Sequence, residues 1–321
     1  MHKRYNDFNS YLRGIFGCRV QKISLDAGLT CPNRDGTKSI GGCIYCNKRG
    51  SGTGAFKTGL SIREQLMQGK EILKRRYKAK RFLAYFQSFS NTYAPLEHLR
   101  RIYEEALDVK DIVGLCIGTR PDCVDKDIVR LLENYTRDYV VWIEYGLQSI
   151  HNETLNRINR GHTYEDFLHA VEMTRGRGIN ICVHIILGLP GEDQKKMLQT
   201  ARALSMLDIQ GIKIHFLYVL KGTKMEEMYH LGEYRCLEQD EYANLVCDFL
   251  EILPPQFVIQ RLTSDPDLNE LVAPAWALHK RETLHLIHKR MDERDTWQGK
   301  KYGVGNDYFD EGAFVLARRF L

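Results

Sequence analysis

Cys31-Pro-Asn-Arg-Asp-Gly-Thr-Lys-Ser-Ile-Gly-Gly-Cys43-Ile-Tyr-Cys46 is the most informative stretch of this 321-residue chain. It places three cysteines in one short, glycine-rich loop. Three thiolates on such a loop can bind three irons of an iron–sulfur cluster and leave the fourth iron without a protein ligand. Because an open iron can bind a molecule that reacts, the loop predicts a catalytic centre with Cys31, Cys43 and Cys46 as metal ligands.

The cysteine spacing also leaves zinc open. A Cys-x2-Cys pair such as Cys43 and Cys46 begins many zinc sites, and Cys18 is near enough in the sequence to serve as a fourth ligand. No second close pair of cysteines follows. Tyr45 favours the cluster, because an aromatic ring at that position can lie against the adenine of a bound nucleoside, although simple loop packing would also account for it.

The composition indicates a cytoplasmic protein with a large core. Hydrophobic residues make up 43% of the chain, yet no apolar run is long enough to span a bilayer. No apolar signal segment follows the charged residues after Met1. An odd total of nine cysteines argues against a disulfide framework.

Two clusters of basic side chains stand out against a formal net charge of +5. One lies between Arg63 and Arg81, and the other lies between His279 and Lys301. Either cluster alone is typical of a solvated helix face. Together they favour a polyanionic substrate, because grouped Lys and Arg side chains displace counterions from phosphates.

Apolar runs and amphipathic stretches alternate along most of the chain. Strands are predicted at 20–25, 81–87, 113–119, 139–148, 179–187, 211–220 and 257–262. Helices are predicted at 60–76, 95–107, 126–134, 164–176, 193–207 and 238–253. Such a run of strand–helix units predicts a parallel α/β sheet, either open or curled into a barrel.

Polar or glycine-rich groups follow five of these strands. They are the cysteine loop, Gln87-Ser88, Thr119-Arg120, Gln148-Ser149 and the stretch 188–191. In a parallel barrel the chemistry sits at the carboxyl ends of the strands. We therefore expect these groups to share one site.

Strand alternation also predicts a polar interior. Glu144, His184, Lys213 and His215 fall on the faces of their strands that should point inward. Such side chains are costly to bury without partners, so they are expected to line a lumen. For each histidine taken singly, a satisfied core residue is an equal alternative.

Four further stretches accompany the cysteine loop. They are Gly118-Thr-Arg-Pro-Asp122, Glu144-Tyr-Gly-Leu-Gln-Ser149, Asn159-Arg-Gly-His-Thr163 and Leu187-Gly-Leu-Pro-Gly191. With them the chain resembles the radical S-adenosylmethionine (SAM) enzymes. The eleven-residue gap after Cys31 departs from the usual Cys-x3-Cys-x2-Cys pattern and resembles the catalytic subunit of elongator, which acts on tRNA wobble uridine. The stretch 27–36 is similar to short bacterial proteins of the MnmL (YtqA) type.

The resemblance implies a fold and a reaction. The fold would be a partial (β/α)6 TIM-type barrel at 19–265, between an N-terminal extension (1–18) and a basic helical extension (266–321). A 4Fe–4S cluster and SAM would generate a 5′-deoxyadenosyl radical with an electron from flavodoxin or ferredoxin. The substrate would be a tRNA anticodon loop, whose 5-carboxymethylaminomethyl uridine would lose its carboxymethyl group. The elongator acetyltransferase chemistry is not expected.

The resemblance also implies roles for individual residues. Cofactor-binding residues would be Tyr45, Gln87, Ser88, Thr119, Glu144, Gln148, Arg160, Gly188 and Gly191. Among them, Arg160 would pair with the SAM carboxylate and Gln148 would contact the ribose. Residues that touch substrate would be Tyr93, Lys213, His215 and Arg261.

Two alternatives remain at this level. The first keeps the radical chemistry and replaces tRNA with a small metabolite or a peptide, in which case the basic clusters are ordinary surface. The second is a zinc-stabilised nucleic-acid-binding protein without catalysis. Iron and sulfide content separates the second from the first.

Overall fold

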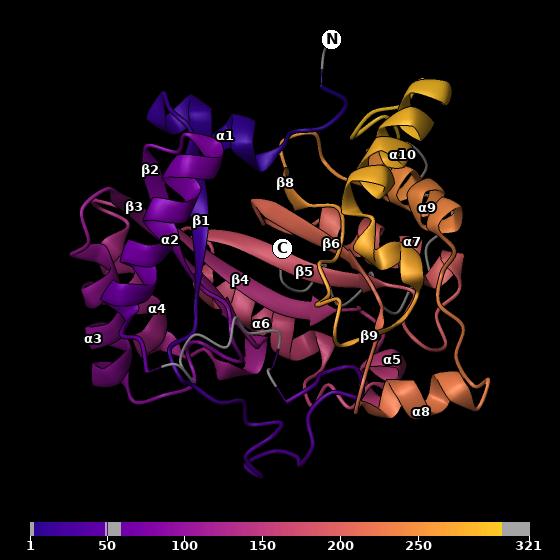
Figure 1. Ribbon diagram of the computed structural model, residues 1–321, viewed down its shortest axis with the longest axis horizontal. Coiled ribbons are helices and arrows are strands. Elements are labelled where there is room, and N and C mark those ends of the chain that lie inside the picture. The colour runs from indigo at the N-terminus through magenta and orange to yellow at the C-terminus, as the bar shows by residue number, and fades with distance from the viewer. Residues whose placement is uncertain (1–2, 49, 51–58, 304–321) are drawn as a thin grey trace.

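A parallel sheet that curls into a half-barrel organises the molecule (Figure 1). The computed structural model describes residues 3–48, 50 and 59–303. The sheet strands are β1 (Val20–Leu25), β2 (Arg81–Phe86), β3 (Ile112–Thr119), β4 (Val140–Gln148), β5 (Asn180–Leu187), β6 (Gly211–Phe216) and β8 (Val258–Arg261). They lie in the order β1-β2-β3-β4-β5-β6-β8, and every neighbouring pair is parallel. The predicted α/β partial barrel is confirmed, with seven strands in its sheet.

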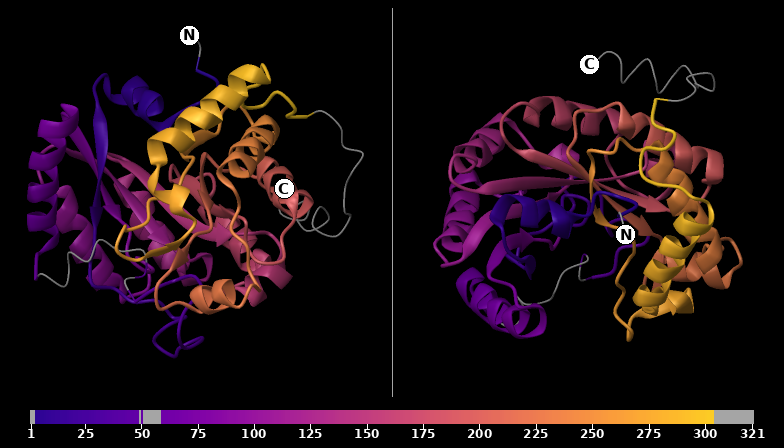
Figure 2. Two further views of the ribbon diagram at one scale, coloured as in Figure 1. Left: turned by 45° about the vertical axis from the view of Figure 1, so that its right-hand side comes forward. Right: turned by 90° about the horizontal axis from the view of Figure 1, so that it is seen from above.

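Helices cover the outside of this sheet (Figure 2). Those that connect successive strands are α2 (Ile62–Tyr77), α3 (Leu96–Leu107), α4 (Lys126–Tyr135), α6 (Tyr164–Thr174), α7 (Gln194–Ser205) and α9 (Gln239–Ile252). The others are α1 (Phe8–Phe16), α5 (Asn152–Arg157), α8 (Lys224–His230) and α10 (Lys280–Glu293), with short 3-10 turns at Pro121–Cys123 and Ala275–Leu278. In the described part of the chain, no helix is both long and apolar enough to cross a membrane.

Local sequence signals fix where two of the connecting helices begin. Ser61 Oγ accepts from the Glu64 backbone N–H at 3.2 Å, and the Glu64 carboxylate accepts from the Ser61 N–H at 2.8 Å. Thr163 and Asp166 form the same reciprocal pair at the start of α6. These capping boxes satisfy backbone donors that a helix leaves free in its first turn.

The strand predicted at 211–220 is interrupted. Strand β6 ends at Phe216, and β7 (Val219–Leu220) pairs instead with β9 (Leu271–Ala273) in a small antiparallel sheet. Ser264 causes the break: its hydroxyl accepts from the Phe216 N–H at 3.2 Å and donates to the Phe216 carbonyl at 2.8 Å. These side-chain bonds replace the ladder that a continuing strand would need.

An apolar plug closes the amino end of the half-barrel. The rings of Phe8 and Tyr11 on α1 lie edge-on to the Trp142 ring, each with its centroid 5.7 Å away. Cys116 and Cys182, which are fully buried, pack in the same interior cluster. The N-terminal segment is thus packed against the sheet, and the interior is left polar only toward the carboxyl ends of the strands.

The segment after β8 packs on the barrel as well. Ile287 and Met291 of α10 are fully buried, and α10 lies along α9 (Figure 2, left). Trp276 stacks on Tyr242 of α9 with ring centroids 5.8 Å apart. This C-terminal part therefore extends the main hydrophobic core.

Gly114 on β3 lies so close to the backbone of β4 that a side chain would not fit. A Cβ at this position would lie 2.0 Å from the Val140 carbonyl oxygen on the neighbouring strand. We expect Gly114→Ala to lower the free energy of unfolding by about 3 kcal/mol, because backbone must shift. Gly14→Ala in α1 is the control, since a Cβ there meets nothing within 4 Å. Equal stability of the two variants in urea unfolding would contradict the expectation.

Candidate active site

A cavity of about 430 Å³ opens at the carboxyl ends of the strands. Its lining comes from the cysteine loop, from the ends of β2, β3, β4, β5, β6 and β8, and from the loop after β8. The predicted site residues that line it are Cys31, Cys43, Tyr45, Cys46, Gln87, Thr119, Glu144, Gln148, Arg160, Lys213, His215 and Arg261. The predicted convergence of the strand ends on one site is confirmed.

Four predicted site residues lie outside this lining. The Tyr93 hydroxyl lies 2.8 Å from Thr37 Oγ1, away from the cavity. Ser88 is buried behind the lining, and its hydroxyl has no hydrogen-bond partner among the described residues. Gly188 and Gly191 both adopt positive φ and shape the turn into α7, where they lie outside the cavity wall.

The cysteine loop is held in place by two polar side chains next to Cys43. Asn33 Nδ2 donates to the Asn159 carbonyl at 2.6 Å and lies 3.7 Å from Cys43 Sγ. Arg160 Nη1 lies 3.4 Å from the same sulfur. Burial alone would raise the pKa of the Cys43 thiol, but the Arg160 guanidinium lowers it below its ordinary value. The arrangement favours the thiolate, which is the metal-binding form.

Arg160 has different contacts from those the sequence suggested. Its Nε and Nη2 donate to the Gly146 carbonyl at 3.2 and 2.6 Å, and its own carbonyl accepts from Arg120 Nη1 at 2.6 Å. The guanidinium is therefore used to tie the cysteine loop to β4. A second side chain, His162, also reaches the Gly146 carbonyl at 3.2 Å.

A buried carboxylate forms the floor of the cavity. Glu144 is fully buried, and both of its oxygens are occupied: Lys22 pairs with Oε1, while Lys213 and His184 contact Oε2. Burial alone would raise the pKa of Glu144, but Lys213 and Lys22 hold it well below its usual range. Both Glu144 oxygens are thus engaged by protein side chains in this structure, and its predicted contact with a cofactor stays a prediction.

Lys213 and the histidines belong to the same floor. Lys213 Nζ also donates to the Tyr85 hydroxyl at 3.1 Å. Burial and the charge of Lys213 lower the pKa of His184 to about 4, and burial lowers the pKa of His215 well below its usual value. Both rings are therefore neutral at pH 7, and the predicted polar lumen is confirmed.

Two of the six non-glycine residues with positive φ in the described part of the chain lie near strand ends beside the cavity. Gln148 at the end of β4 has φ +78°, and Phe89, three residues after β2, has φ +62°. At Gln148 the pairing of β4 with β5 also shifts in register, between Gly146 and Gln148. A Cβ on Gly146 would lie 2.8 Å from both Arg160 Nη2 and Gln148 Nε2. Strain of this kind persists where the surroundings impose it, which is common at binding sites.

Three residues at or below the cavity were not predicted from the sequence. Lys22 lies just below the cavity, where it pairs with Glu144, and it belongs to a predicted strand that is otherwise unremarkable in sequence. Arg34 lines the cavity and donates to the Cys46 carbonyl at 2.8 Å. Phe89 also lines the cavity, and its apolar side chain gave no sequence signal of a functional position. A charged residue within the first predicted strand was the one available signal for Lys22.

The cysteine set fits a cluster better than a single zinc ion. In the described ranges, no three His, Cys, Asp or Glu side chains converge closely enough to hold one metal ion. Cys18, the suggested fourth zinc ligand, lies between α1 and β1 at the opposite end of the barrel. In a 4Fe–4S cluster each cysteine binds a different iron, so three separated thiols around one cavity suit it.

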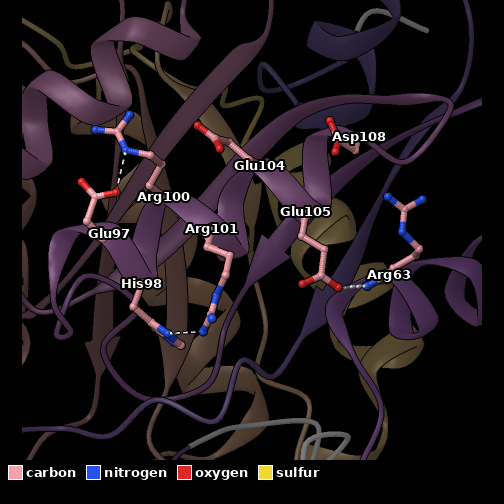
Figure 3. A pocket seen from close by; sticks show the side chains of 8 residues that line it. All are labelled: Arg63, Glu97, His98, Arg100, Arg101, Glu104, Glu105 and Asp108. Atoms are coloured by element: carbon pink, nitrogen blue, oxygen red, sulfur yellow. Dashed lines mark hydrogen bonds and ion pairs between the residues drawn. The ribbon is translucent and has the colours of Figure 1, made fainter.

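A larger hollow, of about 750 Å³, lies on the solvent side of α3 (Figure 3). Its side chains carry both charges and interact with one another. Arg100 lies 3.5 Å from Glu97, and Arg101 lies 2.9 Å from His98 Nδ1. Because this hollow lies on an outer helix, away from the strand ends, it is not a candidate active site.

Neither of the two basic clusters presents unpaired positive charge at the edge of the cavity within the described part of the chain. On α10, Arg290 pairs with Asp240 and Arg294 pairs with Asp248, so acidic side chains of α9 neutralise much of that cluster. The other cluster is densest at the C-terminal end of α2, beside the first residue of β2. That position is the amino end of the barrel, opposite the cavity.

Comparison with known families agrees with this geometry. The profile described as Radical SAM superfamily matches residues 31–204, and that of the Radical_SAM C-terminal domain matches residues 209–293. The Bacillus subtilis protein YtqA is 43% identical over 298 residues, which cover 93% of this chain and 92% of the relative. The Escherichia coli protein YhcC is 36% identical over 304 residues, which cover 94% and 97%.

More distant similarities extend to RNA-related proteins. The tRNA uridine(34) acetyltransferase of Methanocaldococcus jannaschii is 30% identical over 203 residues, which cover 62% of this chain and 36% of the relative. The solved structure of archaeal Methanocaldococcus infernus Elp3, with an N-terminal deletion, superposes with a TM-score of 0.68 at 18% identity. That match covers 87% of this chain and 64% of the other, and it shows a shared fold.

The neutral floor histidines predict a pH dependence of stability. The pKa of His184 falls from 6.5 to about 4 on folding, so the unfolded chain binds more protons in that interval. We expect the free energy of unfolding to drop by roughly 3 kcal/mol from this residue as pH falls from 6.5 to 4. Denaturant unfolding at several pH values measures it.

His184→Gln should remove that part of the pH dependence. His230→Gln is the control, because the His230 side chain is 64% exposed and should contribute little. If the His184→Gln variant keeps the wild-type slope between pH 6.5 and 4, the assignment to this residue is wrong.

Proposed function

The chain belongs to the radical SAM superfamily, and from this premise we propose that it modifies the wobble uridine of tRNA. Enzymes of this superfamily use a 4Fe–4S cluster and SAM, which together supply a 5′-deoxyadenosyl radical that abstracts hydrogen. The proposed change converts 5-carboxymethylaminomethyl uridine to 5-aminomethyl uridine. This is the reaction associated with the MnmL type. Two-electron oxidation of the N–CH2 bond, with SAM as the oxidant, would give an imine, and water would cleave it and release the two carbons of the carboxymethyl group as glyoxylate.

One observation carries the proposal: three cysteine thiols line the same cavity as a polar floor made by the barrel strands. Cys31, Cys43 and Cys46 would hold the cluster, and Arg160 would stabilise the Cys43 thiolate. A volume of about 430 Å³ lies within the range of small-ligand sites. Within the described ranges the cavity is open on one side, so a splayed base would have a path to enter.

The proposed cofactor roles fall on polar and aromatic side chains that line the cavity. Gln87, which follows β2, and Gln148, the last residue of β4, would contact SAM, with Tyr45 against the adenine. Thr119 lines the cavity too, although its hydroxyl lies 2.6 Å from Thr92 Oγ1. The buried floor would exclude water and hold the substrate side chain, which is the positioning that radical chemistry requires.

Similarity supports tRNA as the substrate. The Methanocaldococcus jannaschii relative is named for tRNA uridine(34), and its matching segment covers 62% of this chain. Exposed basic side chains also lie close to the mouth: Lys48 directly follows the lining residue Asn47, and Lys221 directly follows Leu220. We propose that these lysines contact the anticodon-loop phosphates in place of the two basic clusters.

Cysteine substitutions test the cluster assignment. We expect Cys31→Ser, Cys43→Ser and Cys46→Ser each to lose most of the iron and sulfide taken up on anaerobic reconstitution, because each removes one iron ligand. Cys18→Ser is the matched control at the far end of the barrel and should keep full iron content. Full iron in all three loop variants, measured with the visible absorption spectrum, would rule out this set of ligands.

Turnover with tRNA tests the substrate. The reconstituted protein is reduced anaerobically with flavodoxin, and SAM is added with or without tRNA that carries 5-carboxymethylaminomethyl uridine. We expect tRNA to accelerate 5′-deoxyadenosine formation at least tenfold and 5-aminomethyl uridine to appear in the digested tRNA. If 5′-deoxyadenosine forms slowly and at the same rate with and without tRNA, tRNA is rejected as the substrate. If a protein with a full cluster forms no 5′-deoxyadenosine, the enzyme assignment is rejected.

A further inference from the structure

Arg261 lies in the cavity wall and has no hydrogen-bond or ion-pair partner among the described residues. It is the last residue of β8 and is only partly exposed. The other arginines of the wall are engaged: Arg34 and Arg160 donate to carbonyl oxygens, and Arg120 pairs with Asp122. Within the described part of the chain, Arg261 forms neither a hydrogen bond nor an ion pair with another residue.

A partly buried guanidinium without a partner is unfavourable unless a ligand supplies the missing charge. The floor beside it offers none, because both oxygens of Glu144 already contact Lys22, Lys213 and His184. Lys213 lies opposite Arg261 in the β6–β8 register. The end of the cavity near β8 is therefore electropositive, and it suits an anion.

The loop that follows Arg261 carries the opposite charge. Asp265, Asp267 and Glu270 all line the same cavity. Asp265 pairs with Lys280 at 2.9 Å, so Asp267 and Glu270 carry the charge that faces the cavity, and Glu270 accepts from Asn47 Nδ2 at 2.8 Å, next to Cys46. A phosphate would meet these carboxylates and be repelled. A ligand with a carboxylate at one end and an ammonium group close to it would suit both Arg261 and the acidic loop that follows it.

We propose that Arg261 binds the carboxylate of a zwitterionic, glycine-like side chain of the substrate, with the acidic loop facing its ammonium group. The proposal rests on the proposed function, because 5-carboxymethylaminomethyl uridine carries a secondary amine and a carboxylate in this arrangement. Arg261 then selects the substrate over the aminomethyl product, which lacks the carboxylate. A planar guanidinium suits a two-point contact with a carboxylate.

SAM also carries an amino group and a carboxylate, so the experiment separates the two sources. Arg261→Gln removes the charge, Arg261→Lys keeps the charge without the two-point geometry, and Arg130→Gln on the outer face of α4 is the control. All variants are reconstituted, and iron content, SAM affinity and 5′-deoxyadenosine formation without tRNA are measured first. We expect iron content and SAM affinity to match the wild type in every variant, and 5′-deoxyadenosine formation without tRNA to match it in the Arg130→Gln control.

The discriminating measurement compares two ligands. Binding of the free nucleosides 5-carboxymethylaminomethyl uridine and 5-aminomethyl uridine is measured by calorimetry on reconstituted protein with SAM. We expect Arg261→Gln to weaken binding of the first by about 10- to 100-fold and to leave the second unchanged, with Arg261→Lys in between. The KM for tRNA carrying the first nucleoside should rise by a similar factor.

Each outcome decides a separate point. Loss of SAM affinity in Arg261→Gln would assign Arg261 to the cofactor and overturn the proposal, as would equal weakening of both nucleosides. If the wild type processes tRNA and Arg261→Gln does so equally well, the inference fails while the proposed function stands. If the wild type processes no tRNA but still prefers the carboxylated nucleoside through Arg261, the inference stands and the proposed function fails.

Discussion

The Glu144 carboxylate connects parts of the half-barrel that have no backbone bond to each other. Lys22 on β1, an edge strand, pairs with Glu144 on the central strand β4 and also donates to Gln260 on β8, the opposite edge, at 2.6 Å. Lys213 joins β6 to the same carboxylate. A buried ion pair adds little net stability over apolar packing, but removing one member is costly. The network therefore fixes the relative positions of strands whose ends carry the site.

This network also divides the interior into layers with different chemistry. Below it, Trp142 and the rings of α1 fill the amino end with apolar side chains. Above it, the cavity wall is polar and includes the three cysteines. A radical reaction needs a dry, closed floor and an open mouth, and the layering provides both. The strained backbone at Gln148 and Phe89 lies on the open side.

The cysteine loop depends on contacts from a distant part of the chain. Arg160 and Asn159, which follow α5, reach Cys43 Sγ and the loop backbone. Arg160 also bonds to the Gly146 carbonyl on β4, so it links the loop to the strand beside it. These contacts make Arg160 a support for the metal-binding thiolate, and its role as a SAM ligand stays a prediction.

The sequence alone determined the alternation of strands and helices, the parallel sheet and the convergence of Cys31, Cys43 and Cys46 on the strand ends. These follow from periodicity and from the rule that parallel strands share their carboxyl edge, both of which are local or topological. Only the tertiary structure decided that Glu144 pairs with Lys22 and Lys213, and that Arg261 has no hydrogen-bond or ion-pair partner within the part of the chain that the structure describes. Charge pairing between strands far apart in the sequence depends on register and side-chain reach, which no local pattern encodes. The acidic partners that neutralise the α10 cluster were hidden for the same reason, because they lie on α9 about 50 residues earlier in the chain.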